Sequence, residues 1–187
     1  MKKIIVGVTG ASGMPILLEC LRLIREADCA AELIVSRHGE STLQMETGLS
    51  LEQLQGMAAA NYPPEEIGAG PASGTYPTDG MLIVPCSMKT VAGICSGYSD
   101  NLLLRAADVT IKERRPLVLA ARETPLSPIH LRNLLELSYI PCVRIIPPMM
   151  TFYHEPESIE EMTYHIAAKL LEPFGIEAKE YRRWTGI

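Results

Sequence analysis

Short apolar runs without an alternating pattern constrain the fold of this 187-residue chain more than any other feature. The runs at 33–35 and 117–119 contain only Leu, Ile and Val, without the polar residue at every second position that a half-exposed strand shows. Strands of this kind are buried on both faces, as in parallel sheets covered by helices. The runs alternate with helical patterns along the chain. The sequence therefore predicts an α/β fold in three layers around a doubly wound parallel sheet.

The same patterns predict five strands and seven helices. The strands are expected near 3–8, 31–36, 81–85, 116–120 and 142–146. The helices are expected near 13–27, 38–47, 50–60, 88–96, 101–112, 127–138 and 156–172. The stretch 61–78, rich in Pro and Gly, is predicted to be a long loop, and long loops in compact domains are often functional. We expect one domain over 1–187, in which 174–187 form a C-terminal tail with the only tryptophan, Trp184.

Composition argues against several classes of protein. A net charge of −5 argues against general binding to nucleic acid, and no apolar run approaches the roughly 18 residues of a membrane span. Residues 1–3 lead directly into the first strand and leave no room for a signal peptide, so we expect a cytoplasmic protein. The five cysteines show neither CxxC spacing nor pairing with histidines, so we expect reduced thiols and no metal site. His130, His154 and His165 lie in separate segments, where surface or capping roles are expected.

Two turns that join a strand to a helix, at 7–13 and 85–90, predict an anion-binding pocket. The N-terminus of a helix offers free N–H groups and a positive dipole end, and Ser87 and Thr90 add hydroxyl donors. The second strand ends in Ser36, where a dinucleotide site normally has Asp or Glu, which argues against NAD. A mononucleotide such as FMN is the favoured interpretation, and a structural turn or another phosphate is the alternative.

A cluster of basic residues follows these turns. Arg105 and Lys112 lie seven residues apart on one predicted helix and so share a face. They form either a clamp for a phosphate or a solvated face on which Asp108 pairs with both. Glu123, beside Arg122, is a candidate general acid–base, with a structural ion pair to Arg122 as the alternative.

Six motifs, taken together and in this order, resemble the UbiX-type flavin prenyltransferases. They are TGASG (9–13), PCSMKT (85–90), RAADV (105–109), KERRPLVL (112–119), RETPL (122–126) and FYH (152–154). The resemblance spans nearly the whole chain. It implies a Rossmann-like, flavodoxin-type fold assembled into a homododecamer. It also implies transfer of a dimethylallyl group from dimethylallyl monophosphate to N5 and C6 of reduced FMN, which makes prenylated FMN for a UbiD-type decarboxylase.

The resemblance further implies roles for individual residues. The FMN contacts would be Gly10, Ala11, Ser12, Ser36, Ser87, Met88, Lys89, Thr90 and Arg122. The dimethylallyl phosphate contacts would be Tyr153, Lys169, Ser73, Arg105 and Lys112, some of them supplied by neighbouring subunits. Catalysis would depend on Glu123, Glu46, Ser12 and Trp184, the last an aromatic near the prenyl group. Cationic donors would stabilise the leaving phosphate, so no metal is required.

Two other functions remain open at this point. One is a flavin-dependent Cys decarboxylase, which shares the Pro-Cys-Ser turn but carries a PASANxM-like substrate clamp where this chain has IPPMM at 146–150. The other is a non-catalytic flavin carrier or a regulatory subunit of an aromatic acid decarboxylase. The retention of Glu46, Glu123 and Tyr153 argues against a subunit without activity.

Overall fold

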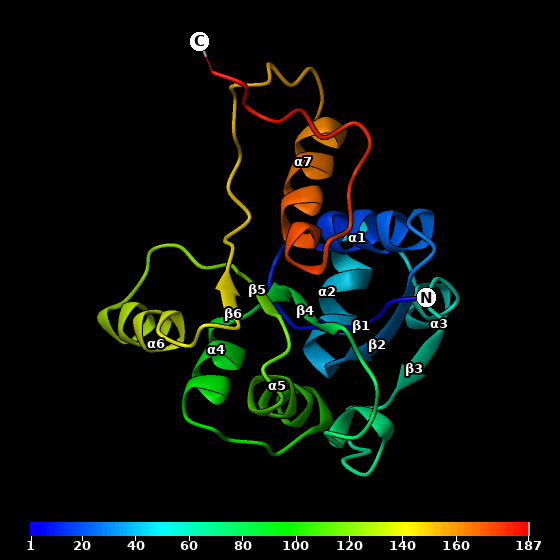
Figure 1. Cartoon of the computed structure of the whole chain (residues 1–187), viewed down its shortest axis with the longest axis vertical. Coiled ribbons are helices and arrows are strands. Elements are labelled where there is room, and N and C mark those ends of the chain that lie inside the picture. Colours follow the sequence, from blue (N-terminus) through cyan, green and yellow to red (C-terminus); the bar gives the residue numbers. More distant parts are fainter. Residues whose placement is uncertain (187) are drawn as a thin grey trace.

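The computed structural model describes residues 1–186, and over this range it contains a six-stranded parallel sheet between two helical layers (Figure 1). The strands are β1 (Lys3–Val8), β2 (Ala30–Val35), β3 (Ala60–Tyr62), β4 (Gly80–Cys86), β5 (Leu117–Ala121) and β6 (Val143–Ile145). They lie in the order β3-β2-β1-β4-β5-β6. Successive strands are added on one side of β1 up to β3 and on the other side from β4 onward, so the strand order reverses between β1 and β4. In open α/β sheets, the carboxyl ends of the strands at such a switch point form the ligand site. The predicted doubly wound parallel sheet is confirmed.

Helices cover both faces of the sheet (Figure 1). They are α1 (Met14–Glu26), α2 (Arg37–Thr47), α3 (Leu51–Gln55), α4 (Met88–Cys95), α5 (Leu102–Lys112), α6 (Pro128–Ser138) and α7 (Ile159–Leu171), with short 3-10 turns η1 (Gly70–Ala72) and η2 (Glu172–Phe174). In β4, Leu82 and Val84 pack with α1, α2, α3 and α7, whereas Met81 and Ile83 pack with α4, α5 and α6. Both faces of the strand are therefore apolar, which is why the runs lack alternation.

One strand was missed by the sequence prediction. The helix expected over 50–60 ends at Gln55, before Gly56, a residue of low helix propensity. Residues 60–62 instead form β3, which pairs with β2 at the edge of the sheet. A strand of three residues is too short to show a period. Without β3 the strand order is that of flavodoxin, and with it the order is that of the Rossmann fold.

The predicted loop 61–78 is irregular apart from the end of β3 and η1. Arg115, just before β5, holds it in place: its Nη1 donates to the Tyr76 carbonyl at 2.9 Å and its Nη2 donates to the Gly74 carbonyl at 2.7 Å. Residues that precede β5 lie at the amino edge of the sheet. The later part of the loop, including Ser73, is therefore anchored at that edge.

A buried carboxylate joins this loop to the first strands. Glu32 of β2 is 4% exposed, and it accepts a hydrogen bond from the Tyr76 hydroxyl at 2.9 Å. Its Oε1 lies 3.2 Å from Nζ of Lys3 in β1, and the Tyr62 hydroxyl of β3 lies 3.0 Å from that of Tyr76. Burial is the main reason that the pKa of Tyr62 is raised. The network connects three strands and the loop, and it satisfies a charge that would otherwise be costly to bury.

The C-terminal segment packs against the rest of the chain. Phe174 is buried, so the tail begins at Gly175, and Ile187 lies outside the described residues. The Glu180 N–H donates to the Tyr164 hydroxyl on α7 at 2.8 Å. Figure 1 shows the tail running beside α7 and beside residues 146–158, which join β6 to α7 and are called the arm below. No helix within residues 1–186 is long and apolar enough to cross a membrane.

Candidate active site

The residues predicted to bind FMN gather at the carboxyl edge of the sheet. Gly10, Ala11 and Ser12 follow β1, Ser36 follows β2, Ser87 to Thr90 follow β4, and Arg122 follows β5. These four strands are neighbours and run parallel, so their carboxyl ends share one edge. The structure therefore brings the predicted FMN contacts together around the switch point.

Thr9, to which the sequence analysis gave no separate role, joins the two central turns. Its side chain is buried, and Oγ1 donates to the Pro85 carbonyl at 2.9 Å while accepting from the Ser87 N–H at 2.8 Å. The Thr9 N–H also donates to the Pro85 carbonyl, at 3.2 Å. These bonds hold the turn after β1 against the turn after β4. The sequence signal for this role was the Thr9 hydroxyl, which begins the TGASG motif directly after a buried strand.

The N-terminus of α4 carries donors that suit a phosphate. Ser87 Oγ accepts from the Thr90 N–H at 3.4 Å and lies 3.1 Å from Thr90 Oγ1, which caps the helix. The first N–H groups of a helix lack intrahelical acceptors and share the positive end of its dipole. Lys89 and Arg122 are exposed cations at the same edge, and the Arg122 N–H donates to the Cys86 carbonyl at 3.1 Å. This set of donors fits the phosphate of FMN.

The N-terminus of α1 departs from the sequence prediction of two equivalent anion-binding turns. The N–H groups of Gly13 and Met14 donate to Oε2 of Glu46 at 3.0 and 2.8 Å, so a carboxylate of the protein already occupies this anion position. Burial is the largest influence on Glu46 and acts to raise its pKa. The Ser12 hydroxyl, the two N–H groups and the charge of Arg122 outweigh it and lower the pKa below 4.5. Glu46 is therefore an ionised group that contacts Ser12 and is stabilised by the positive charge of Arg122.

Gly10 and Ser36 have structural duties in addition to their predicted contacts. A Cβ at position 10 would lie 2.6 Å from the Cβ of His38, so the glycine lets the start of α2 approach the turn after β1. Ser36 Oγ accepts from the Gly39 N–H at 3.1 Å and caps α2. The glycine was interpreted from sequence as a close approach to a ligand, and here the close neighbour is another segment of the chain.

Glu123 follows Arg122 at the end of β5, and both side chains are exposed. Its Oε1 accepts from the Thr124 N–H at 3.0 Å. No ion pair between Arg122 and Glu123 forms within the described range 1–186. In this part of the chain the structural pair considered from the sequence is therefore absent.

The residues predicted to contact dimethylallyl phosphate do not converge within one chain. Lys112 is the last residue of α5 and pairs with Glu113. Its Nζ lies close to Gly74, 2.5 Å from the position that a Cβ at residue 74 would occupy. Lys112 and the adjacent Ser73 thus lie together at the amino edge, away from the FMN residues. Arg105 pairs with Asp108 at 2.9 Å, as the solvated-face alternative predicts. The predicted pair between Lys112 and Asp108 is wrong, because Lys112 pairs with Glu113 instead.

Lys169 lies near the end of α7, where it pairs with Glu172 at 2.6 Å. It lines a cavity of about 990 Å³ with Arg114 and Arg144, bordered by Pro116 and other residues that precede β5 and β6. The side chain is exposed and carries its charge to the amino side of the sheet, at a distance from the turn after β4.

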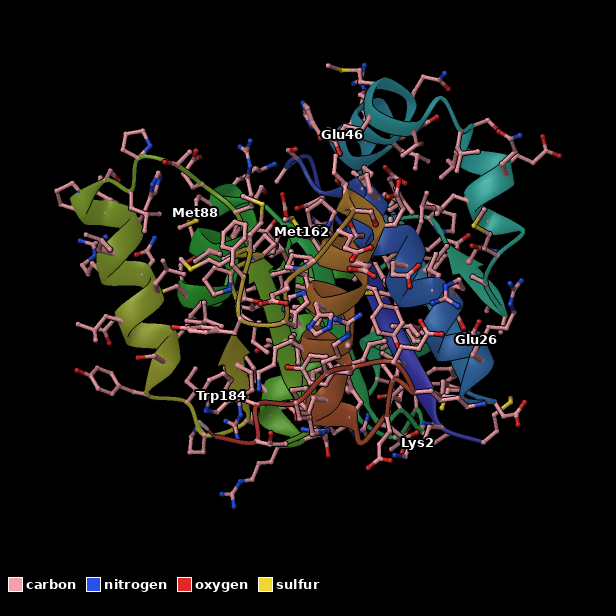
Figure 2. The ribbon with its side chains drawn as sticks, turned by 90° about the horizontal axis from the view of Figure 1, so that it is seen from above. Lys2, Glu26, Glu46, Met88, Met162 and Trp184 are labelled. Atoms are coloured by element: carbon pink, nitrogen blue, oxygen red, sulfur yellow. The ribbon has the colours of Figure 1, made fainter. Side chains whose placement is uncertain are left out.

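Tyr153 and Trp184, predicted from different motifs, are brought together. Their ring centroids lie 5.6 Å apart with the planes tilted by 59°. Tyr153 belongs to the arm and is 82% exposed, and Trp184 belongs to the tail and is 65% exposed. Figure 2 shows Trp184 and Glu46 on opposite sides of the molecule. The aromatic pair of one chain is thus far from the FMN residues of that chain.

Within residues 1–186, no group of three or more His, Cys, Asp and Glu side chains is arranged to hold a metal ion. The five cysteines are free thiols, two of them fully buried, and burial raises the pKa of Cys86 to about 12. A thiol with so high a pKa is a poor nucleophile.

Comparison with known proteins places this geometry in a family. A flavoprotein family model matches residues 1–170. The flavin prenyltransferase LpdB of Lactiplantibacillus plantarum is 48% identical over 187 residues, which cover 100% of both chains. The chain belongs to the UbiX-like flavin prenyltransferases.

Two solved UbiX-like structures have the same fold. One is described as a dodecameric FMN-dependent UbiX-like decarboxylase from Escherichia coli; it is 44% identical, has a TM-score of 0.95, and the match covers 98% of this chain and 100% of that one. The other is AnUbiX in complex with FMN and dimethylallyl pyrophosphate, which is 39% identical with a TM-score of 0.96, over 100% of this chain and 98% of that one. The UbiX-like arrangement therefore extends along the whole chain.

Proposed function

We propose that this chain is a flavin prenyltransferase, which transfers a dimethylallyl group from dimethylallyl monophosphate to N5 and C6 of reduced FMN. The observation that carries the proposal is the convergence of Ser36, Ser87 to Thr90 and Arg122 at the switch point of a chain that belongs to the UbiX-like family. AnUbiX, crystallised with FMN and dimethylallyl pyrophosphate, supports the pairing of these two ligands.

The carboxyl edge would hold the flavin. The N–H groups at the start of α4 and the hydroxyls of Ser87 and Thr90 donate to the phosphate, and the guanidinium of Arg122 adds charge-assisted hydrogen bonds. When bound in its reduced form, FMN supplies the electron-rich N5 and C6 to which the prenyl group is attached. Glu46 is held in place by α1, so its charge and Ser12 face the site in a defined geometry.

The cationic side chains would stabilise the prenyl phosphate as its allylic C–O bond breaks. Negative charge then develops on the leaving phosphate, and preorganised donors such as Arg105, Lys112 and Lys169 stabilise that charge without a metal. The π faces of Tyr153 and Trp184 stabilise the allylic cation. The proton lost from N5 as the first bond forms would pass to the prenyl alkene, which lets C6 form the second bond. Glu123 would donate a proton to the phosphate and accept the one that leaves C6.

These two halves of the site are separate in a single chain, so we propose that neighbouring subunits complete it. Ser73 and Lys112 lie at the amino edge, opposite the FMN residues. Exposed apolar side chains on the arm and the tail are Met149, Met150, Phe152, Tyr153 and Trp184. Clusters of this kind mark protein–protein contacts. The dodecamer described for the Escherichia coli relative supports a homododecamer here, and light scattering coupled to size-exclusion chromatography tests it.

We further propose that residues 1–187 act as one domain with a tail, that the protein is cytoplasmic, and that its product passes to a UbiD-type decarboxylase. The single sheet shared by β1 to β6 supports the first point. The last follows from the reaction, because a covalently modified flavin serves no further step in the proposed cycle and must be used by another protein. Activation of a purified apo-decarboxylase by the reaction mixture tests it.

Mass spectrometry of the released flavin tests the activity. Protein, reduced FMN and dimethylallyl monophosphate are incubated anaerobically with and without EDTA, and the flavin is expected to gain the mass of one prenyl unit in both cases. Unmodified FMN released from a folded, FMN-bound protein would show a carrier without activity. Conversion of a peptidyl cysteine with loss of CO₂ would favour the Cys decarboxylase, and turnover that EDTA abolishes and Mg²⁺ restores would contradict the metal-free mechanism.

A further inference from the structure

Two histidines that are far apart in the sequence form a stack beneath the C-terminal tail. The rings of His154 in the arm and His165 on α7 are parallel to within 2°, with centroids 3.5 Å apart. Tyr181 of the tail lies 5.0 Å from the His165 ring and Tyr164 of α7 packs at 6.2 Å with an edge. His165 is 9% exposed. Three segments therefore meet in one aromatic cluster, whereas surface or capping roles were expected for both histidines from the sequence.

The stack is linked along the chain to the Tyr153–Trp184 pair. His154 follows Tyr153 in the chain, and Arg182 precedes Trp184 by two residues. Arg182 Nη1 donates to the His154 carbonyl at 2.8 Å, and its Nη2 lies 3.8 Å from Oε1 of Glu161 on α7. We call the His154–His165 stack together with the Arg182 bond the clasp. It fastens the arm to the tail at the point where the two aromatic rings meet.

The clasp disfavours a charged imidazole at His165. Burial is the main cause that lowers the pKa of His165 below 6.5, and the charges of His154 and Arg182 lower it further, against the opposing charge of Glu161. Nε2 of His154 is buried without a hydrogen-bond partner in the described part of the chain, so a proton there would have no acceptor. Two stacked imidazolium rings would also repel each other.

The carboxylates around the clasp, within the described residues, form no hydrogen bond that would stabilise a charged imidazole. A cavity of about 670 Å³ adjoins it, into which α1 contributes Glu19 and Arg22, α7 contributes Glu160 and Glu161, and the tail contributes Lys179, Glu180 and Arg182. Arg22 lies over the Tyr164 ring at 5.8 Å. Within residues 1–186, no hydrogen bond joins any of these carboxylates to either imidazole; the ring contact present is from Thr151 Oγ1 to His154 Nδ1 at 3.5 Å.

We propose that His154 and His165 are positioning residues, which hold Tyr153 and Trp184 together while the His165 imidazole is neutral and release them when it is protonated. This inference rests on the proposed function, in which Tyr153 and Trp184 contact the prenyl substrate. The direction of the pH dependence follows from the linkage between proton binding and clasp opening. Because the closed clasp disfavours the proton, the open state binds more protons, and the closed state is lost as pH falls below about 6.5.

Fluorescence tests the clasp without substrate, because Trp184 is the only tryptophan of the chain. The emission of the intact oligomer is measured from pH 8 to pH 5. We expect one transition with a midpoint below 6.5 in the wild type and none in His165→Phe, which keeps a ring in the stack but does not titrate. His130→Gln removes an imidazole from the α6 capping box, which Gln also completes, and should keep the transition. A flat wild-type titration, or the same transition in His165→Phe, overturns the proposal.

A second variant guards against misfolding. If His165→Phe does not fold, His165→Gln also removes the titrating imidazole and is expected to abolish the same transition. Arg182→Gln loosens the clasp and should move the midpoint to higher pH, since less free energy opposes protonation. An unchanged midpoint in Arg182→Gln together with an unchanged transition in His165→Gln would overturn the proposal.

Kinetics then connect the clasp to the reaction. From pH 8 to pH 5.5 the KM for dimethylallyl monophosphate should rise several-fold more in the wild type than in His165→Phe, with kcat less affected. The substrate phosphate also titrates near pH 6, but equally for both proteins. Equal rises in KM would overturn the positioning role. A fluorescence transition that His165→Phe removes, in a protein that makes no product at any pH, would support the clasp and contradict the proposed function instead.

Discussion

The carboxylate of Glu46 accepts a hydrogen bond of 2.8 Å from the backbone N–H of Met14, at the N-terminus of α1. A second bond, of 3.0 Å from Gly13, completes the contact. The positive end of α1 is therefore neutralised by the protein itself, whereas the N-terminus of α4 is capped by the Ser87 hydroxyl and has no acidic residue in its first turn. Two turns that look alike in sequence thus differ in charge, and the anionic group of a ligand is directed to the second.

Replacing Glu46 by Gln should lower stability modestly, because it removes a charged cap from α1. The expected loss is about 1 kcal/mol, or a Tm lower by roughly 2–4 °C for a chain of this size. The pKa of Glu46 is depressed on folding, so its contribution is present above pH 4.5 and is lost as pH falls through the folded value. Thermal scans at a series of pH values should show the full difference at pH 7 and a shrinking difference as the pH falls below 4.5. Glu66→Gln, in an exposed loop, is the matched control, and an equal loss there would contradict the capping role.

Replacing Arg122 by Ala should weaken FMN, whereas Lys112→Ala should spare FMN and weaken dimethylallyl monophosphate. The two side chains lie at opposite edges of the sheet, so each serves one ligand. Each lost charged hydrogen bond should cost on the order of 1.5–3 kcal/mol. Calorimetric titration of both ligands into both variants measures the split. Equal losses for the two ligands in either variant would contradict this division.

Replacing Glu123 by Gln should separate binding from chemistry. Glu123 forms no ion pair with Arg122 within residues 1–186, so the Tm and the affinity for FMN should remain those of the wild type. Product formation should fall by ~10²–10⁴-fold, the usual contribution of a general acid–base. Single-turnover prenylation checks this. A normal rate would assign the proton transfer to the released phosphate, and a Tm lower by many degrees would indicate a structural role.

Replacing Tyr76 by Phe should loosen the loop that carries Ser73. The Tyr76 hydroxyl donates to Glu32 at 2.9 Å and lies 3.1 Å from Nζ of Lys3, so its loss leaves a buried carboxylate with one partner fewer. The expected cost is about 1–3 kcal/mol. Thermal unfolding and limited proteolysis within 61–78 measure it. Tyr139→Phe, whose ring is 70% exposed, is the control, and a similar effect there would contradict the role of the network.

Local patterns decided most of the fold and the position of the FMN residues. Runs such as 117–119 identify buried strands, and hydroxyl residues such as Ser36 and Ser87 directly after a strand act as helix caps. In a doubly wound sheet the carboxyl ends of neighbouring strands share an edge. Chain order, together with the family resemblance, was therefore enough to predict that Ser12, Ser36, Ser87 and Arg122 lie at one edge.

Only the tertiary structure decided the remaining contacts. The sequence carries no sign that Glu46 caps α1, that Ser73 and Lys112 lie opposite the FMN edge, or that His154 stacks on His165. Helix and strand patterns arise from interactions between residues a few positions apart, and these are written in any short window of the chain. Contacts between distant segments depend on how whole elements dock, through packing and burial summed over the complete core, and no short window of the sequence contains that sum.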